Sequence, residues 1–204
     1  TPAYDTVVRW TTRERAVKRA LLNATGLDRA RRLMDVGCGT GTFVIAVKRR
    51  YPHLDVVGVD PDPKVLERAR VKARRAGVDV TFLPGSATDL PAPDDAFDRV
   101  TSSLVFHHLT SDQKRRATGE IARVLTDGGE FHMADWVRPA NVLMRVLFWS
   151  VQLLDGFDTT RDHADGRLLE LLAAGGLADV TQHRSFATPA GTVGLMSARP
   201  ATAS

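Results

Sequence analysis

The stretch Leu33-Met-Asp-Val-Gly-Cys-Gly-Thr-Gly41 decides how this chain folds, because an apolar strand runs directly into three glycines at alternate positions. Glycine has no Cβ, so such a loop lets a ligand approach the backbone and lets the turn adopt positive φ. In doubly wound α/β sheets a loop of this kind opens at the carboxyl end of a central strand, where ligands bind. The stretch therefore predicts an α/β sheet with a binding site where its first strand ends.

Apolar, β-branched runs alternate with helical patterns on both sides of this loop. Strands are expected at 32–36, 55–59, 78–83, 97–103 and 130–135, and helices at 43–50, 63–76, 110–125 and 164–174. Such alternation requires crossover connections, and hence parallel strands covered on both faces. Two last strands, 178–186 and 192–199, are joined by too short a link for a crossover and should pair antiparallel. The expected fold is a doubly wound, seven-stranded, mostly parallel Rossmann-like sheet with an antiparallel C-terminal hairpin at its edge.

Composition narrows the classes of protein. The chain has 204 residues, with 28 Lys and Arg against 24 Asp and Glu, and we expect a single domain over residues 1–204. Its one cysteine excludes an intrachain disulfide and a zinc site of several thiolates. Basic residues are interleaved with acids and only 6% of residues are aromatic, so a nucleic-acid partner is not expected. Residues 1–5 show no signal-peptide core, which makes the cytoplasm the expected compartment.

An insertion at 136–163 separates the fifth strand from the last helix. Its centre, 141–154, is helical in pattern but apolar on nearly every side, whereas a surface helix carries a polar face. This segment is expected either to be buried on two sides or to form a substrate wall, a subunit interface or a membrane contact. It is too short for the roughly 20 residues of a bilayer span, so a membrane contact through 141–157 would be peripheral. We interpret 136–163 as an apolar helical cover, and the sequence leaves the oligomeric state open.

An acid follows the second strand. Asp60 lies 19 residues beyond Gly41, where it can accept hydrogen bonds from a ribose diol. The dinucleotide pattern is Gly-x-Gly-x-x-Gly, but here Thr42 occupies the sixth position, and the loop has no Lys or Arg for a pyrophosphate. A nucleoside without phosphates fits better, and S-adenosylmethionine is the commonest cofactor of that description. An NAD(P)-dependent oxidoreductase and a non-catalytic S-adenosylmethionine-binding partner protein are the alternatives.

With these features the sequence resembles the class I S-adenosylmethionine-dependent methyltransferases, in particular the small-molecule branch that includes ubiquinone and menaquinone biosynthesis enzymes. The resemblance runs in order through residues 30–136. Its segments are Leu33 to Gly41, Val57-Gly-Val-Asp-Pro61, Gly85-Ser-Ala-Thr-Asp-Leu-Pro91 with Phe97-Asp98, Val105-Phe-His-His-Leu109, and Gly128-Gly129 with Ala134-Asp135. The edge hairpin also agrees with the seven-stranded sheet of that family.

The resemblance implies roles for individual residues. Asp35 and the backbone of the glycine loop would hold the methionine portion of the cofactor, Asp60 the ribose, and Pro61 would lie against adenine. Ser86 replaces an acid that often accepts the adenine amino group, so it offers a weaker, uncharged acceptor. Ser103 would approach the cofactor beneath the sulfonium. The full set of expected cofactor contacts is Asp35, Gly37, Cys38, Gly39, Gly41, Asp60, Pro61, Ser86, Ala87 and Ser103.

Methyl transfer from a sulfonium is an in-line displacement, so alignment of the acceptor with the methyl group matters most. Proton acceptors should lie beyond the carboxyl ends of the fourth and fifth strands, where His107, His108 and Asp135 stand. His132 is expected to be a core histidine in the middle of a strand, whereas Trp136 and Phe106 are candidates for a pocket wall. No carboxylates are grouped after the fourth strand, so no metal is expected. The predicted activity is methylation of a small, apolar organic acceptor, with S-adenosylhomocysteine as the by-product.

Overall fold

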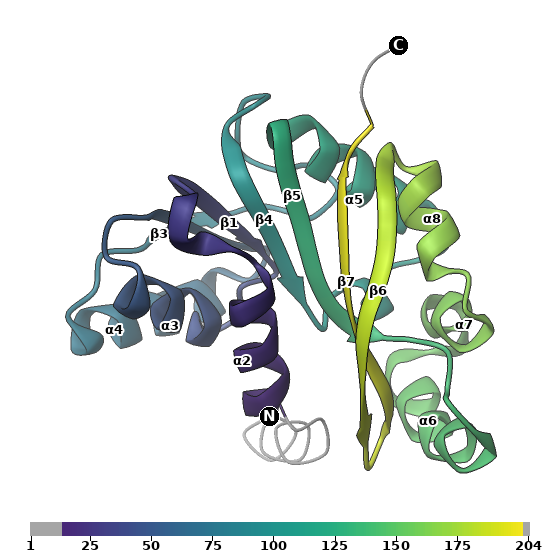
Figure 1. The fold of residues 1–204 in the computed structure, drawn as a ribbon. Coiled ribbons are helices and arrows are strands. Elements are labelled where there is room, and N and C mark those ends of the chain that lie inside the picture. The colour runs from purple at the N-terminus through teal and green to yellow at the C-terminus, as the bar shows by residue number, and fades with distance from the viewer. Residues whose placement is uncertain (1–13, 202–204) are drawn as a thin grey trace.

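A seven-stranded sheet forms the centre of the computed structural model, which describes residues 14–201. The strand order is β3-β2-β1-β4-β5-β7-β6 (Figure 1). Strands β1 to β5 are parallel, and β7 pairs antiparallel with both β5 and β6. The strands are β1 (Arg32–Val36), β2 (Asp55–Asp60), β3 (Thr81–Pro84), β4 (Phe97–Ser103), β5 (Leu125–Trp136), β6 (Leu177–Thr188) and β7 (Gly191–Pro200). The predicted fold class and edge hairpin are confirmed.

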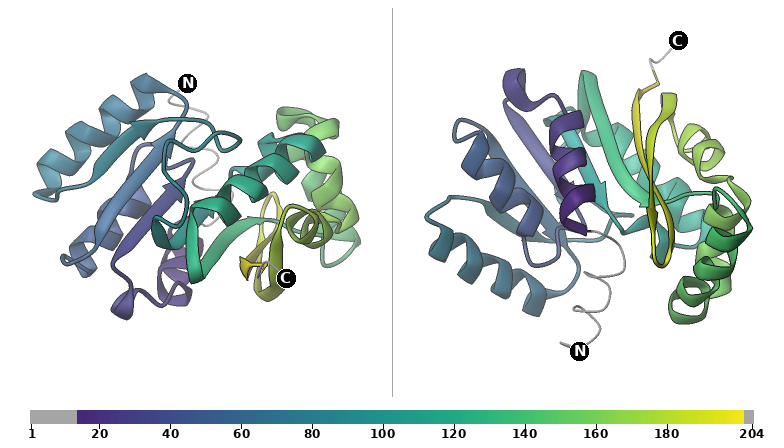
Figure 2. Two further views of the ribbon diagram at one scale, coloured as in Figure 1. Left: turned by 90° about the horizontal axis from the view of Figure 1, so that it is seen from above. Right: turned by 60° about the horizontal axis from the view of Figure 1, so that its bottom comes forward.

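Helices cover both faces of this sheet. The α-helices are α2 (Glu14–Ala24), α3 (Thr42–Arg50), α4 (Pro63–Ala76), α5 (Ser111–Val124), α6 (Val142–Asp155), α7 (Phe157–Asp165) and α8 (Leu168–Ala174), with short 3₁₀ turns at Leu27–Arg29 and Phe106–His108. Side chains of α2, α3 and α4 share one apolar core, and those of α5 and α8 share the other. Helices α6 and α7 lie beside the C-terminal hairpin in both further views (Figure 2).

The helix ends follow from local sequence. Asp62 caps α4 by accepting hydrogen bonds from the backbone N–H groups of Lys64 and Val65, and Gly77 ends this helix in the left-handed region at φ 66°. Thr110 and Gln113 form a capping box at the start of α5. Because these signals act within one helical turn, the predicted bounds of α4 match the structure and those of α5 agree to within a residue.

Three predicted bounds were wrong. Strand β5 begins at Leu125 rather than residue 130, because the residues expected to form a turn at 126–129 belong to the strand. Strand β3 begins at Thr81 rather than residue 78, since Gly77 and the residues after it return the chain from α4 to the sheet. The expected helix at 164–174 is two helices, because Gly166 adopts φ 78° and ends α7 before α8 begins. His132 lies within β5, buried, and its Nε2 is 3.2 Å from a carboxylate oxygen of Glu130, as expected for a satisfied strand histidine.

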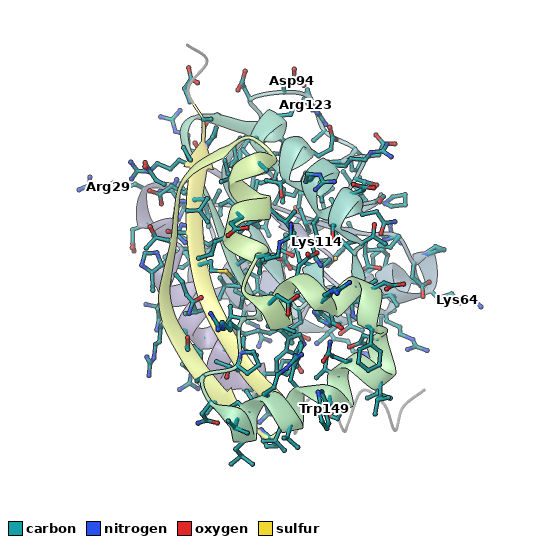
Figure 3. The ribbon with its side chains drawn as sticks, turned by 90° about the vertical axis from the view of Figure 1, so that its right-hand side faces the viewer. Arg29, Lys64, Asp94, Lys114, Arg123 and Trp149 are labelled. Atoms are coloured by element: carbon teal, nitrogen blue, oxygen red, sulfur yellow. The ribbon has the colours of Figure 1, made fainter. Side chains whose placement is uncertain are left out.

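A buried ion pair fixes α7 against α5. Lys114 is fully buried, and its Nζ donates hydrogen bonds to Asp162 Oδ2 at 3.1 Å and to the Thr159 carbonyl at 2.6 Å. Ser111 Oγ donates to the same carboxylate oxygen at 2.6 Å. Figure 3 shows Lys114 among the side chains inside the molecule. These bonds set the position of the segment that follows α6.

Helix α6 buries only one side. Phe148, Val151 and Gln152 are buried, and the Phe148 ring packs edge-on against Trp136. The opposite side is exposed, with Trp149 at the outer surface (Figure 3). Its large apolar members are Val142, Leu143, Val146, Trp149, Leu153, Leu154 and, at the start of α7, Phe157. We call this set the α6 apolar face. Burial on two sides is therefore not found within the described chain, and no helix there reaches the length and apolarity of a membrane span.

Candidate functional site

The glycine loop is fixed to the end of β2. The backbone N–H groups of Gly37 and Cys38 both donate to the Val59 carbonyl, at 2.8 and 2.9 Å. Gly37, Gly39 and Gly41 have φ values of 72°, 54° and 73°, which L residues with a side chain rarely adopt. The predicted positive φ is thus present at all three positions.

The expectation that all three glycines make room for a ligand was wrong. A Cβ on Gly37 would lie 2.3 Å from Val105 Cγ2, and one on Gly41 would lie 3.0 Å from the Phe82 ring, so these two glycines make room for the protein itself. A Cβ on Gly39 would meet no described atom within 4 Å. Gly39 is therefore the glycine of this loop whose backbone is not covered by other atoms on its Cβ side.

Asp60 lies against this same glycine. Its Oδ2 accepts the Gly39 N–H at 2.9 Å, and its Oδ1 accepts the Asp62 N–H at 3.0 Å. A carboxylate oxygen has two lone pairs, so each keeps one for a further donor such as a ribose hydroxyl. The parallel pairing of β1 with β2, which sets Val36 opposite Val59, brings the acid and the loop together. Pro61 follows on the exposed side.

Asp35, inside the same end of the sheet, is a buried acid. Thr101 Oγ1 donates to its Oδ1 at 2.7 Å. Burial raises the pKa of Asp35 to about 7, while the Thr101 hydrogen bond and the positive charge of Lys18 act in the opposite direction. A cationic ligand nearby would shift this carboxyl to its charged form.

The other expected cofactor contacts differ in their surroundings. Ser103 Oγ is buried and has no hydrogen-bond partner among residues 14–201, which makes it a polar atom available to a ligand. Ser86 is exposed, and its Oγ lies 2.9 Å from Thr88 Oγ1 in a local turn that also contains the half-buried Ala87. The Cys38 thiol is buried against Gly58, and burial raises its pKa, so it is a poor nucleophile.

Asp135 organises the loop after β4. Its Oδ2 accepts the N–H groups of Val105 and Phe106 at 3.0 and 2.8 Å, and its Oδ1 accepts that of Trp136 at 2.7 Å. His107 Nδ1 lies 2.8 Å from Oδ1. Burial alone would raise the pKa of Asp135, but His107 and the donated hydrogen bonds hold it well below its usual range. Because a carboxylate can only accept, Nδ1 of His107 is the protonated nitrogen.

Asp155, at the end of α6, completes a cluster with the two histidines. Its Oδ2 is 3.7 Å from His107 Nε2, and its Oδ1 is 3.7 Å from His108 Nδ1. His107 is buried, whereas about half of the His108 side chain (51%) is exposed. Burial, and then the adjacent His107, lower the pKa of His108. The sequence analysis missed Asp155; its only signal is that it is the acid ending an otherwise apolar helix.

His163 of α7 was also missed, and no sequence signal indicates it. It is fully buried, and its Nδ1 donates to the Trp136 carbonyl at 2.6 Å, so Nε2 keeps an unprotonated lone pair. Nε2 has no hydrogen-bond partner in the described part of the chain. Burial lowers the pKa of His163 to about 4, which keeps the ring neutral. Phe106, expected as a pocket wall, instead packs against Phe131 in the core.

Comparisons with known proteins find methyltransferases. A family model described as a methyltransferase domain matches residues 33–129. The demethylmenaquinone methyltransferase of Thermus thermophilus is 39% identical over 137 residues, which are 67% of this chain and 58% of that protein. The enzyme of the same name from Deinococcus radiodurans is 38% identical over 118 residues, or 58% of this chain and 48% of that protein. The chain thus spans about half the length of these curated relatives.

The crystal structure of the YcgJ protein from Bacillus subtilis shares the fold, with a TM-score of 0.73, 19% sequence identity, and coverage of 93% of this chain and 100% of that one. The glycine loop, Asp60 and the loop after β4 all fall within or next to the residues that the family model matches. Residues 33–129 of the chain are a methyltransferase domain of the class I S-adenosylmethionine-dependent type.

Proposed function

We propose that the protein transfers a methyl group from S-adenosylmethionine, by in-line displacement, to a small apolar acceptor held between the loop after β4 and the end of α6. The observation that carries the proposal is the convergence of three ligand-ready groups at one end of the sheet. These are the Asp60 carboxylate with a lone pair on each oxygen, the open side of Gly39, and the unpartnered Ser103 Oγ.

These residues fit the cofactor chemically. Asp60 would accept the ribose hydroxyls, and Asp35 would face the methionine ammonium, whose positive charge favours the carboxylate form of this buried acid. Pro61 and the backbone at Ala87 would lie beside adenine, with Ser86 as an uncharged acceptor. The bound cofactor supplies an electrophilic methyl group; the protein's own contribution is to hold it in line with the acceptor and to exclude water.

The acceptor would meet the two histidines. His107 keeps a free Nε2 lone pair because Asp135 holds the proton on Nδ1, so it can take a proton from an acceptor hydroxyl or carbon acid. His108 is the alternative proton acceptor on the more exposed side. Asp135 is already the acceptor of four hydrogen bonds, so we assign it the positioning of the loop and of His107 rather than direct contact with the acceptor.

An apolar ring compound is the acceptor class we favour. The curated relatives are named for a demethylated menaquinone, a lipid-soluble quinone. The α6 apolar face would rest on a lipid surface and bring such a compound to the site. This contact with the membrane would be peripheral and on its cytoplasmic side. Arg145 is the only charged residue of α6 before Asp155. Burial of the α6 apolar face would therefore remove few charged groups from water, and the free-energy cost of desolvation would be small.

Two measurements test the proposal. Titration calorimetry should record saturable binding of S-adenosylmethionine and S-adenosylhomocysteine but not of NAD(P). Incubation with methyl-labelled S-adenosylmethionine and short-chain naphthoquinols should then label the acceptor, as read by mass spectrometry. Binding without transfer to any quinol, phenol or amine would favour the non-catalytic binder, and binding of NAD(P) alone would favour an oxidoreductase.

A further inference from the structure

Three side chains that can ligate a metal lie together after β4 and at the end of α6, where the sequence predicts no metal site. One ring nitrogen from each of His107 and His108 and one carboxylate oxygen of Asp155 lie within 4.8 Å of one another. The two nitrogens come from the loop after β4 and the carboxylate comes from the end of α6. Tertiary packing alone brings them together, since Asp155 follows His108 by 47 positions in the sequence.

The two histidines lie too far from Asp155 for direct hydrogen bonds. His107 Nε2 is 3.7 Å from Asp155 Oδ2 and His108 Nδ1 is 3.7 Å from Oδ1, beyond the 2.7–3.2 Å of an ordinary N–H···O bond. Ligand atoms about 2.1 Å from one zinc ion at the tetrahedral angle lie about 3.4 Å apart. The three ligand atoms, which lie within 4.8 Å of one another, would draw closer together on one ion.

The protonation of His107 also suits a metal ligand. Its Nδ1 proton is held by the buried carboxylate of Asp135 at 2.8 Å, and its Nε2, which keeps a lone pair, lies 3.7 Å from Asp155 Oδ2. A carboxylate that orients a ligating imidazole in this way is the common outer support of protein zinc sites.

We propose that His107, His108 and Asp155 bind one divalent first-row transition ion of the Zn²⁺ type, with the exposed side of His108 leaving a position open to an acceptor oxygen. Two imidazoles and one carboxylate are a donor set that zinc and its neighbours accept, whereas Mg²⁺ and Ca²⁺ prefer oxygen alone. The inference rests on the proposed methyl transfer and replaces the role of His107 as the proton acceptor. An acceptor hydroxyl on the ion would release its proton to water and keep the electron pair that attacks the methyl group.

This role and that of His107 as a proton acceptor exclude each other, because both use the Nε2 lone pair.

The test is made on the full chain without a histidine tag, stripped of metal with a chelator. Calorimetric titration with ZnCl₂ should give one ion per chain, and Co²⁺ should give the visible absorption of a tetrahedral site. Asp155→Asn and His108→Gln should each weaken Zn²⁺ binding at least tenfold.

Exposed residues of the same types provide matched controls. Asp158→Asn in α7 and His53→Gln after α3 should leave the Zn²⁺ affinity unchanged. Circular dichroism of each variant confirms that it is folded. Absence of saturable Zn²⁺ and Co²⁺ binding, or binding that survives both Asp155→Asn and His108→Gln, would overturn the proposal. Since no cofactor is present in this titration, its failure is distinct from a failure to bind S-adenosylmethionine.

Discussion

His107 and Asp135 form a buried pair in which Nδ1 lies 2.8 Å from a carboxylate oxygen that also accepts the Trp136 N–H. The second oxygen of Asp135 accepts two more backbone N–H groups, from Val105 and Phe106. One carboxylate thus fixes both the loop after β4 and the protonation of the imidazole at its centre.

Replacement of Asp135 should therefore destabilise the fold. In Asp135→Ala the buried amides of Val105, Phe106 and Trp136 lose their acceptor, and each buried group left unpaired costs about 1–3 kcal/mol. Urea unfolding measures the loss. Asp98→Ala is the matched control, since Asp98 accepts two backbone N–H groups at the surface, where water replaces it. Equal losses in the two variants would argue against this role of Asp135.

The ribose assignment predicts a loss of cofactor affinity in Asp60→Ala. A hydrogen bond to a charged group contributes about 1.5–3 kcal/mol, so affinity for S-adenosylmethionine should fall roughly 10- to 150-fold. Asp62→Ala, which removes the cap of α4, should cost helix stability by about 0.5–2 kcal/mol and leave the affinity unchanged. Calorimetry on both folded variants checks this; an unchanged affinity in Asp60→Ala removes Asp60 from the site.

Alanine at Gly39 tests whether the cofactor passes over this residue, with alanine at Gly77 as the control for backbone strain. Gly39 and Gly77 both have positive φ, and a Cβ on either would meet no described atom within 4 Å. Alanine at either position should cost about 1–2 kcal/mol of stability from the left-handed backbone. Only Gly39→Ala should also weaken S-adenosylmethionine binding, because its methyl group would enter the space of the cofactor. If both variants bind alike, the cofactor does not pass over Gly39.

Asp35 predicts a specific pH dependence of stability. The pKa of Asp35 in the folded protein, about 7, lies above its ordinary value of 3.8, so the folded state holds this proton more tightly than the unfolded state does. The contribution of the bound proton to the free energy of unfolding is therefore complete below about pH 4 and is lost as the pH rises through 7. Asp35→Asn has no such titration and can still accept from Thr101. Relative to wild type, the variant should gain stability between about pH 4 and 7, by up to roughly 4 kcal/mol. Urea unfolding at several pH values checks this, and a pH-independent difference would refute it.

The α6 apolar face predicts binding to lipid vesicles. Leu153 and Leu154 are 74% and 69% exposed, and burial of each side chain in a bilayer interface is worth about 1.5–3 kcal/mol. Leu153→Gln with Leu154→Gln should reduce co-sedimentation with phosphatidylcholine vesicles at least tenfold. Ala173→Gln with Ala174→Gln, on the exposed side of α8, should not. A change of oligomeric state in the leucine variant, without a change in vesicle binding, would reassign this face to a subunit contact.

Sequence alone determined the sheet, the glycine loop and the placement of Asp60. Their signals are local: a cap, a glycine or a period of apolar residues acts within a few positions, and parallel pairing of β1 with β2 then brings Asp60 to Gly39. The tertiary structure decided which glycine faces open space, which side of α6 is exposed, and that Asp155 and His163 join the loop after β4. These depend on packing between segments far apart in the chain, here fixed by bonds such as that of Lys114 with Asp162, which no local pattern encodes.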